Sequence, residues 1–106
     1  MSIIEANVSA LEVALAAGAR LVDVRETDEY EAGHVAGAVH IALGTVPQQV
    51  QAFEGDTVYV ICRTGARSKR ACEFLAQQGV EAINVAGGTL DWLAGGRPVV
   101  TGSRPL

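Results

Sequence analysis

Short runs of apolar residues, rich in valine and isoleucine, recur along the chain and are bounded by polar residues or glycine. Runs of this length without a polar side are typical of strands that are buried on both faces of a sheet. A shorter apolar segment, SII at 2–4, indicates an additional strand at the sheet edge. The pattern predicts four main strands: RLVDV (20–24), GAVHI (37–41), TVYVI (57–61) and EAINV (81–85).

The segments between these runs have apolar residues at helical spacing. The first helix, SALEVALAAGA from Ser9, begins with a capping box formed by Ser9 and Glu12 and ends at Gly18. Proline in a first turn and glycine just after a last turn mark the bounds of the others. Three further helices are predicted: TVPQQVQAF (45–53), RSKRACEFLAQQG (67–79) and the short GTLDWLAGG (88–96).

Strands that alternate with helices indicate an α/β fold, a small parallel β-sheet of about five strands flanked by helices on both faces. A chain of 106 residues, 49% hydrophobic and 19% charged, fits one compact domain with a real core. We therefore expect a single domain over 1–106, in which 99–106 form a loosely held tail.

The charge of the chain is unevenly distributed. The net charge of −4 and the isoelectric point near 5.0 argue against nucleic-acid binding, which needs a broad basic surface. Four of the eight basic residues nevertheless fall within eight positions, at Arg63, Arg67, Lys69 and Arg70. A cluster of this size suits one small anion.

Cysteine usage and hydropathy indicate where the protein works. Two cysteines do not form a disulfide framework, and MSIIEANVSA lacks the pattern of a signal peptide. No run is long enough to span a bilayer, so we expect a cytoplasmic protein without a membrane partner. The spacing of His34 and His40 and of the two cysteines matches no compact zinc pattern, so no metal is expected.

The segment ICRTGARS (61–68) places Cys62 between the most hydrophobic strand and the start of a helix. Ligands of parallel sheets bind at this end of the strands, and a glycine turn followed by a helix start presents unpaired backbone N–H groups. With Arg63 and Arg67 nearby, this setting favours a thiolate, which is a nucleophile. The alternative is a buried, inert cysteine that ends a strand.

Two chemistries use a cysteine in such a loop, the cleavage of phosphate esters and the transfer of a sulfane sulfur. In the cysteine phosphatases five residues separate the cysteine from the arginine that clamps the phosphate. Here only four, RTGA, separate Cys62 from Arg67. The shorter loop forms a tighter cradle, which suits one extra sulfur on Cys62 better than a phosphate ester.

Three motifs in this order resemble the single-domain rhodaneses, which are thiosulfate sulfurtransferases. VDVRETDEYEAGHVAGAVHI (22–41) is similar to the family's first conserved segment, CRTGARS (62–68) to its active-site loop and VAGGTLDW (85–92) to its Gly-Gly and Trp segment. Ala36 and Ala42 stand where the family usually has proline, which loosens turns without changing the chemistry.

The resemblance implies that Cys62 takes a sulfur from an anionic donor such as thiosulfate, becomes a persulfide, and passes the sulfur to cyanide, a thiol or a sulfur-accepting protein. It implies no cofactor, because the sulfur is carried covalently. Asp23 and Arg25 would brace the site without taking part in the chemistry. Arg63 would face either the anion or only solvent. The substrate-binding residues would be Arg63, Thr64, Gly65, Ala66, Arg67 and Ser68.

Two other functions remain open. One is a non-catalytic or sulfur-carrier binding module of the same fold, although this chain retains Cys62. The other is a cysteine phosphatase or arsenate reductase, which the four-residue gap and the lack of an aspartate placed as an acid in the loop disfavour.

Several other residues have structural interpretations. Cys72, Trp92, Leu90 and Leu93 are expected to border or fill the core, and Gly87 and Gly88 to form a tight turn near the site. His34 is expected to brace a turn through hydrogen bonds. An acidic, solvated helix face is predicted for Glu26, Asp28, Glu29 and Glu31.

Overall fold

The computed structural model describes residues 3–106 and contains one five-stranded sheet. All neighbouring strands are parallel, in the order β1-β5-β4-β2-β3. The predicted α/β fold with a small parallel sheet is therefore confirmed. The strands are β1 (Ile4–Ala6), β2 (Arg20–Asp23), β3 (Val39–His40), β4 (Val58–Ile61) and β5 (Ala82–Val85).

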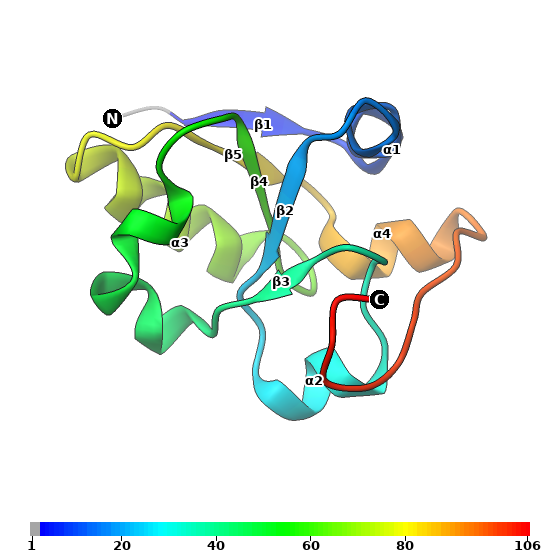
Figure 1. The fold of residues 1–106 in the computed structure, drawn as a ribbon. Helices are drawn as coiled ribbons and strands as arrows, with labels where there is room; N and C mark the ends of the chain where they lie inside the picture. The colour runs from blue at the N-terminus through cyan, green and yellow to red at the C-terminus, as the bar shows by residue number, and fades with distance from the viewer. Residues whose placement is uncertain (1–2) are drawn as a thin grey trace.

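Helices cover both faces of the sheet, as Figure 1 shows. One face is covered by α3 and the two 3-10 segments, and the other by α1, α2 and α4. No helix within residues 3–106 is long and apolar enough to cross a membrane. The helices are α1 (Val8–Ala16), α2 (Thr27–Ala32), η1 (Leu43–Gln48), η2 (Val50–Phe53), α3 (Ala66–Gln77) and α4 (Gly88–Ala94).

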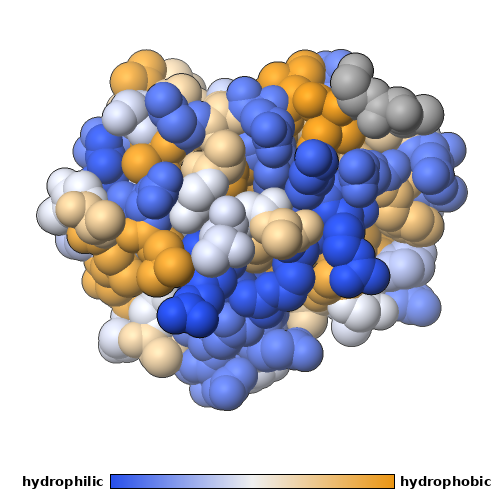
Figure 2. Space-filling model, turned by 180° about the vertical axis from the view of Figure 1, so that it is seen from behind, coloured by the Kyte–Doolittle hydropathy of each residue, from blue (hydrophilic) through white to orange (hydrophobic). Residues whose placement is uncertain are grey.

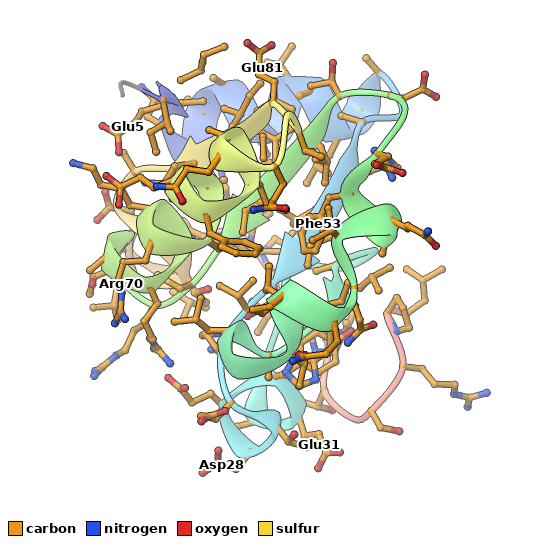
Figure 3. All side chains as sticks on the ribbon, turned by 90° about the vertical axis from the view of Figure 1, so that its left-hand side faces the viewer. Glu5, Asp28, Glu31, Phe53, Arg70 and Glu81 are labelled. Carbon is orange, nitrogen blue, oxygen red and sulfur yellow. The ribbon has the colours of Figure 1, made fainter. Side chains whose placement is uncertain are left out.

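Side chains of the central strand alternate between two hydrophobic clusters, because successive residues of a strand point to opposite faces. Val58 and Val60 pack on the α3 side, where Phe53 of η2 also points inward (Figure 3). Tyr59 and Ile61 pack on the opposite side with Trp92. The central strand β4 is thus packed on both faces, which explains its continuous apolar run in the sequence.

The first helix begins two residues earlier than predicted. Its N-cap is Asn7, whose Oδ1 accepts a hydrogen bond from the Ala10 N–H at 2.9 Å. The capping box of Ser9 and Glu12 is therefore wrong, because Ser9 already lies inside α1. The predicted edge strand at 2–4 lies partly outside the described residues, and β1 pairs with β5 over Ile4–Ala6.

The predicted helix at 45–53 forms instead as two short 3-10 segments, η1 and η2, separated at Gln49. Pro47 lies inside η1, where its ring and its missing N–H interrupt α-helical hydrogen bonding. The predicted helices at 67–79 and 88–96 are α3 and α4: α3 begins one residue earlier and ends two earlier than predicted, and α4 begins at Gly88 as predicted and ends two residues earlier.

The C-terminal segment folds back against α2 and the turn that follows it (Figure 1). His34 and Val100 exchange two backbone hydrogen bonds of 2.8 Å, and the Gly102 N–H donates to the Glu31 carbonyl. The buried His34 ring also lies 2.7 Å from the Tyr30 carbonyl and 2.9 Å from the Arg104 carbonyl. His34 therefore braces this turn, as predicted. The segment 99–106, which we expected to be a loosely held tail, is joined to the turn by these backbone hydrogen bonds.

Candidate functional site

Cys62 lies directly after β4, and α3 begins four residues later at Ala66. Gly65 is the N-cap of α3 and has a left-handed backbone conformation, with φ of 107°. Glycine adopts this conformation without steric cost, so the chain can turn sharply from strand to helix. The predicted helix start close to Cys62 is therefore present, and the loop brings the first N–H groups of α3 back toward the sulfur.

Cys62 is only 1% exposed, and hydrogen-bond donors surround its Sγ. The Gly65 N–H lies 3.1 Å from Sγ and the Ser68 hydroxyl 3.3 Å. Burial by itself raises the pKa of the Cys62 thiol, but hydrogen bonds from the Ser68 side chain and from the backbone N–H groups of Ser68, Gly65 and Thr64 lower it below its ordinary value. The loop therefore favours the thiolate through backbone groups and one hydroxyl.

The start of α4 closes the loop from the other side. The Thr89 N–H and hydroxyl both donate to the Cys62 carbonyl at 2.9 Å, and the Leu90 N–H donates to the Arg63 carbonyl at 3.0 Å. Gly88, with φ of 58°, lies so close that a Cβ there would come within 2.5 Å of the Arg63 carbonyl oxygen. The predicted tight Gly87-Gly88 turn is therefore in contact with the candidate site.

The predicted anion ligand Arg67 is occupied by an acidic residue from α2. Its Nη1 and Nη2 donate to the two carboxylate oxygens of Glu29 at 2.7 and 3.0 Å. The hydrogen bond from Arg67 lowers the pKa of the Glu29 carboxyl to about 2. The interpretation of Glu29 as part of a solvated face is thus wrong, whereas Asp28 and Glu31 do point into solvent (Figure 3).

The other basic residues of the cluster at 63–70 are exposed and have no ion pair within residues 3–106. They are Arg63, Lys69 and Arg70, the last of which points outward from α3 in Figure 3. Figure 2 shows hydrophilic residues across the middle of the rear face, with an apolar patch on either side. The positive charges of this cluster that have no acidic partner therefore belong to exposed side chains, whereas the charge of Arg67 is paired with that of Glu29.

Asp23 and Arg25 form a buried ion pair at the end of β2. Arg25 donates to both Asp23 carboxylate oxygens, at 3.0 to 3.1 Å from Nε and 2.9 Å from Nη2, and also to the Gly33 carbonyl at 2.7 Å. The pair therefore joins β2 to the end of α2, the helix that supplies Glu29. This position fits the bracing role that the resemblance implies.

Asn84 on β5 contacts the site and was not identified from the sequence. It is 1% exposed, its Oδ1 accepts a hydrogen bond from the Ser68 hydroxyl, and its Nδ2 donates to the Gly65 carbonyl. The only available signal was a polar residue in the apolar run EAINV, because buried polar groups need partners.

The assignments of apolar residues near the site were partly correct. Cys72 and Trp92 are buried in the two clusters, as predicted. Leu90 and Leu93 are instead 42% and 47% exposed, so their assignment to the core is wrong. The helix α4 has only seven residues, and Trp92 occupies its buried side.

The two cysteines should differ in reactivity. Burial raises the pKa of the Cys72 thiol to about 12, whereas the pKa of Cys62 is lowered. Because the thiolate is the reacting form, we expect limiting iodoacetamide at neutral pH to label Cys62 first. The labelling rate of Cys62 should level off at a lower pH than that of Cys72, which should keep rising up to about pH 12. Peptide mass spectrometry at several pH values measures both rates, and equal labelling would contradict this prediction.

Comparisons with known proteins identify the family and the fold. Residues 7–95 match the rhodanese-like domain family. YtwF of Bacillus subtilis is 39% identical over 95 residues, which cover 87% of this chain and 92% of that protein. A sulfurtransferase of Allochromatium vinosum is 35% identical over 82 residues, 76% of this chain and 77% of that one. The human single-domain sulfurtransferase TSTD1 superposes with a TM-score of 0.79 at 27% identity, covering 88% and 97% of the two chains.

The fold and the matched residues place the chain in a class of domains to which proteins named sulfurtransferase belong. The chain belongs to the rhodanese-like family.

Proposed function

We propose that this protein transfers a sulfane sulfur from thiosulfate or a similar anionic donor to cyanide or a thiol acceptor, through a persulfide on Cys62. The observation that supports the proposal is the ring of donors around one sulfur atom: the Ser68 hydroxyl and the N–H groups of Thr64, Gly65 and Ser68. Such donors stabilise negative charge on a sulfur at this position.

In the first step the Cys62 thiolate attacks the outer sulfur of thiosulfate. The new Sγ–S bond forms as the sulfur–sulfur bond of the donor breaks, and sulfite leaves with the bonding electron pair. The negative charge then resides on the outer sulfur of the persulfide, within reach of the loop N–H groups. Cyanide attacks that sulfur in the second step, thiocyanate leaves, and the thiolate is regenerated without a cofactor.

Loop dimensions support sulfur transfer over phosphate ester cleavage. Four residues separate Cys62 from Arg67, and both donor nitrogens at the tip of Arg67 are engaged by Glu29. A phosphatase would need an arginine free to clamp a phosphate with both of these groups. We therefore expect no hydrolysis of p-nitrophenyl phosphate at a rate comparable with sulfur transfer.

Intact mass spectrometry tests the proposal directly. After incubation with thiosulfate and removal of the excess, the protein should gain the mass of one sulfur atom, and peptide mapping should place it on Cys62. Addition of cyanide should remove the added mass and release thiocyanate. A protein that stays unmodified by thiosulfate and by an organic persulfide donor would instead be a binding module, and the proposal would be rejected.

Glu29 should weaken the attraction of an anionic donor, because it neutralises Arg67. Glu29→Gln keeps the size of the side chain but removes its charge, so we expect the KM for thiosulfate to fall about two- to fivefold. The fall should be largest at low salt. The matched control is Glu31→Gln, which removes an exposed charge from the same helix. An equal change in both variants at every salt concentration would contradict a specific effect on Arg67.

A further inference from the structure

The Ser68 hydroxyl has one proton and three acceptors around it. Its Oγ lies 2.5 Å from Asn84 Oδ1, 3.3 Å from Cys62 Sγ and 3.3 Å from the Gly65 carbonyl oxygen. Ser68 is 0% exposed, so its hydroxyl is out of contact with bulk solvent. A hydroxyl donates only one hydrogen bond, so these acceptors compete for it. The Gly65 carbonyl oxygen also accepts from the Lys69 N–H and from Asn84 Nδ2, which leaves Sγ and Oδ1 as the main competitors.

The orientation of the Asn84 amide decides how this competition is balanced. Its Nδ2 donates to the Glu5 Oε2 at 2.8 Å and to the Gly65 carbonyl at 3.2 Å. Both partners are acceptors without a proton, so the NH2 group must face them and the Oδ1 must face Ser68. Glu5 lies on the edge strand β1 (Figure 3), and its carboxylate thus fixes an amide beside the cysteine loop.

The direction of the Ser68 proton matters to the sulfur. While the proton points to Asn84, a lone pair of the Ser68 oxygen faces Sγ. That lone pair can accept the S–H of a neutral thiol, but it repels a thiolate. When the proton turns to a thiolate, the buried Asn84 Oδ1 loses its only donor among residues 3–106, which costs free energy.

We propose that Asn84 is a positioning residue that acts through Ser68: its Oδ1 competes with the Cys62 thiolate for the hydroxyl proton, weakens the hydrogen bond to the thiolate, and regains the proton once sulfur is loaded. The proposal rests on the proposed function in that Cys62 is the reacting sulfur. A thiolate that is held less strongly by this donor is a stronger nucleophile, because each hydrogen bond must be weakened as the lone pair of the sulfur attacks.

The same network favours the loaded state. When Sγ bonds to the transferred sulfur and sulfite departs, the negative charge moves from Sγ to the outer sulfur. The inner sulfur is then neutral and needs no hydrogen bond from Ser68. The hydroxyl proton can return to Asn84 Oδ1, so that the buried amide is satisfied in the persulfide and strained only in the free thiolate.

A double-mutant cycle on the ionisation of Cys62 tests the proposal. Asn84→Ala, and Asn84→Val as a second variant that suits a strand, should free the Ser68 proton for the thiolate. We expect the acid dissociation constant of Cys62 to increase about threefold to tenfold, measured by thiolate absorbance against pH. Ser68→Ala should change it in the opposite direction. In the Ser68→Ala background the Asn84 substitutions should have no further effect.

A structural role for Asn84 in the loop would give a different result. Substitution would then change the ionisation of Cys62 equally with and without the Ser68 hydroxyl, and the proposal would be overturned. If an Asn84 variant fails to fold, a measurement on the wild-type protein can still test the proposal. The side-chain amide resonances of Asn84 should shift with the ionisation of Cys62 in the wild type but not in Ser68→Ala. Resonances that stay fixed in the wild type would refute the coupling of Asn84 to Cys62 through Ser68.

These experiments need no sulfur transfer, so the two proposals can fail separately. A protein that never loads sulfur but shows coupling between Asn84 and Ser68 would refute the proposed function and support the role of Asn84. A protein that loads sulfur on Cys62 without this coupling would support the proposed function and refute the role of Asn84.

Discussion

Replacing Cys62 by serine is expected to reduce thiosulfate:cyanide turnover by at least about 10³-fold, the scale on which removal of a nucleophile acts. A serine hydroxyl does not ionise near neutral pH and forms no persulfide. The substitution leaves the N–H groups of the loop in place, so any remaining turnover measures the contribution of these donors without the reacting sulfur. Steady-state thiocyanate formation and intact mass after thiosulfate treatment are the two measurements.

Cys72→Ser is the matched control, because it removes the second thiol, which lies on the buried side of α3 in the core. Its turnover should stay close to that of the wild type, with a modest loss of stability from a hydroxyl in the core. Wild-type turnover in Cys62→Ser would refute the persulfide mechanism. Loss of turnover in a folded Cys72→Ser variant would show that the two thiols act together.

The architecture was predictable because it depends on patterns that extend over many residues. Val58 and Val60 face one cluster and Tyr59 and Ile61 the other, and this double burial is visible in the sequence as an uninterrupted apolar run. The position of Cys62 followed in turn, since the end of a parallel strand and the start of a helix meet at one edge of the sheet.

The predictions that were wrong or missing depend on competition between neighbouring residues or on contacts between distant segments. Asn7 and Ser9 are both acceptable N-caps, and only the end of β1 decides between them. Glu29 is 38 residues from Arg67 along the chain, so its partner is invisible to helical periodicity. Asn84 is separated from Ser68 by 16 residues in the same way. The sequence thus indicates the candidate reactive residue, whereas the residues that contact it and pair with its neighbours emerge only from the packed structure.

Gly88→Ala is expected to disrupt the candidate site from outside the loop. A Cβ at Gly88 would lie 2.5 Å from the Arg63 carbonyl oxygen and 2.6 Å from the Cys62 carbonyl oxygen. Backbone atoms cannot rotate away as a side chain can, so the loop or the start of α4 must move. We expect a loss of about 3 kcal/mol in the free energy of unfolding and about a 10²-fold loss of turnover, because the N–H donors no longer converge on one sulfur.

Gly18→Ala separates this clash from the conformational cost of alanine at a positive φ. Gly18 has φ of 92°, and a Cβ there would meet no atom within 4 Å. We therefore expect it to lose only about 1 kcal/mol of stability, without a change in turnover. Urea denaturation and thiocyanate formation should be measured on both variants. Equal losses in the two would mean that the positive φ alone is responsible, and that the contact between α4 and the carbonyls of Cys62 and Arg63 does not hold the loop in its shape.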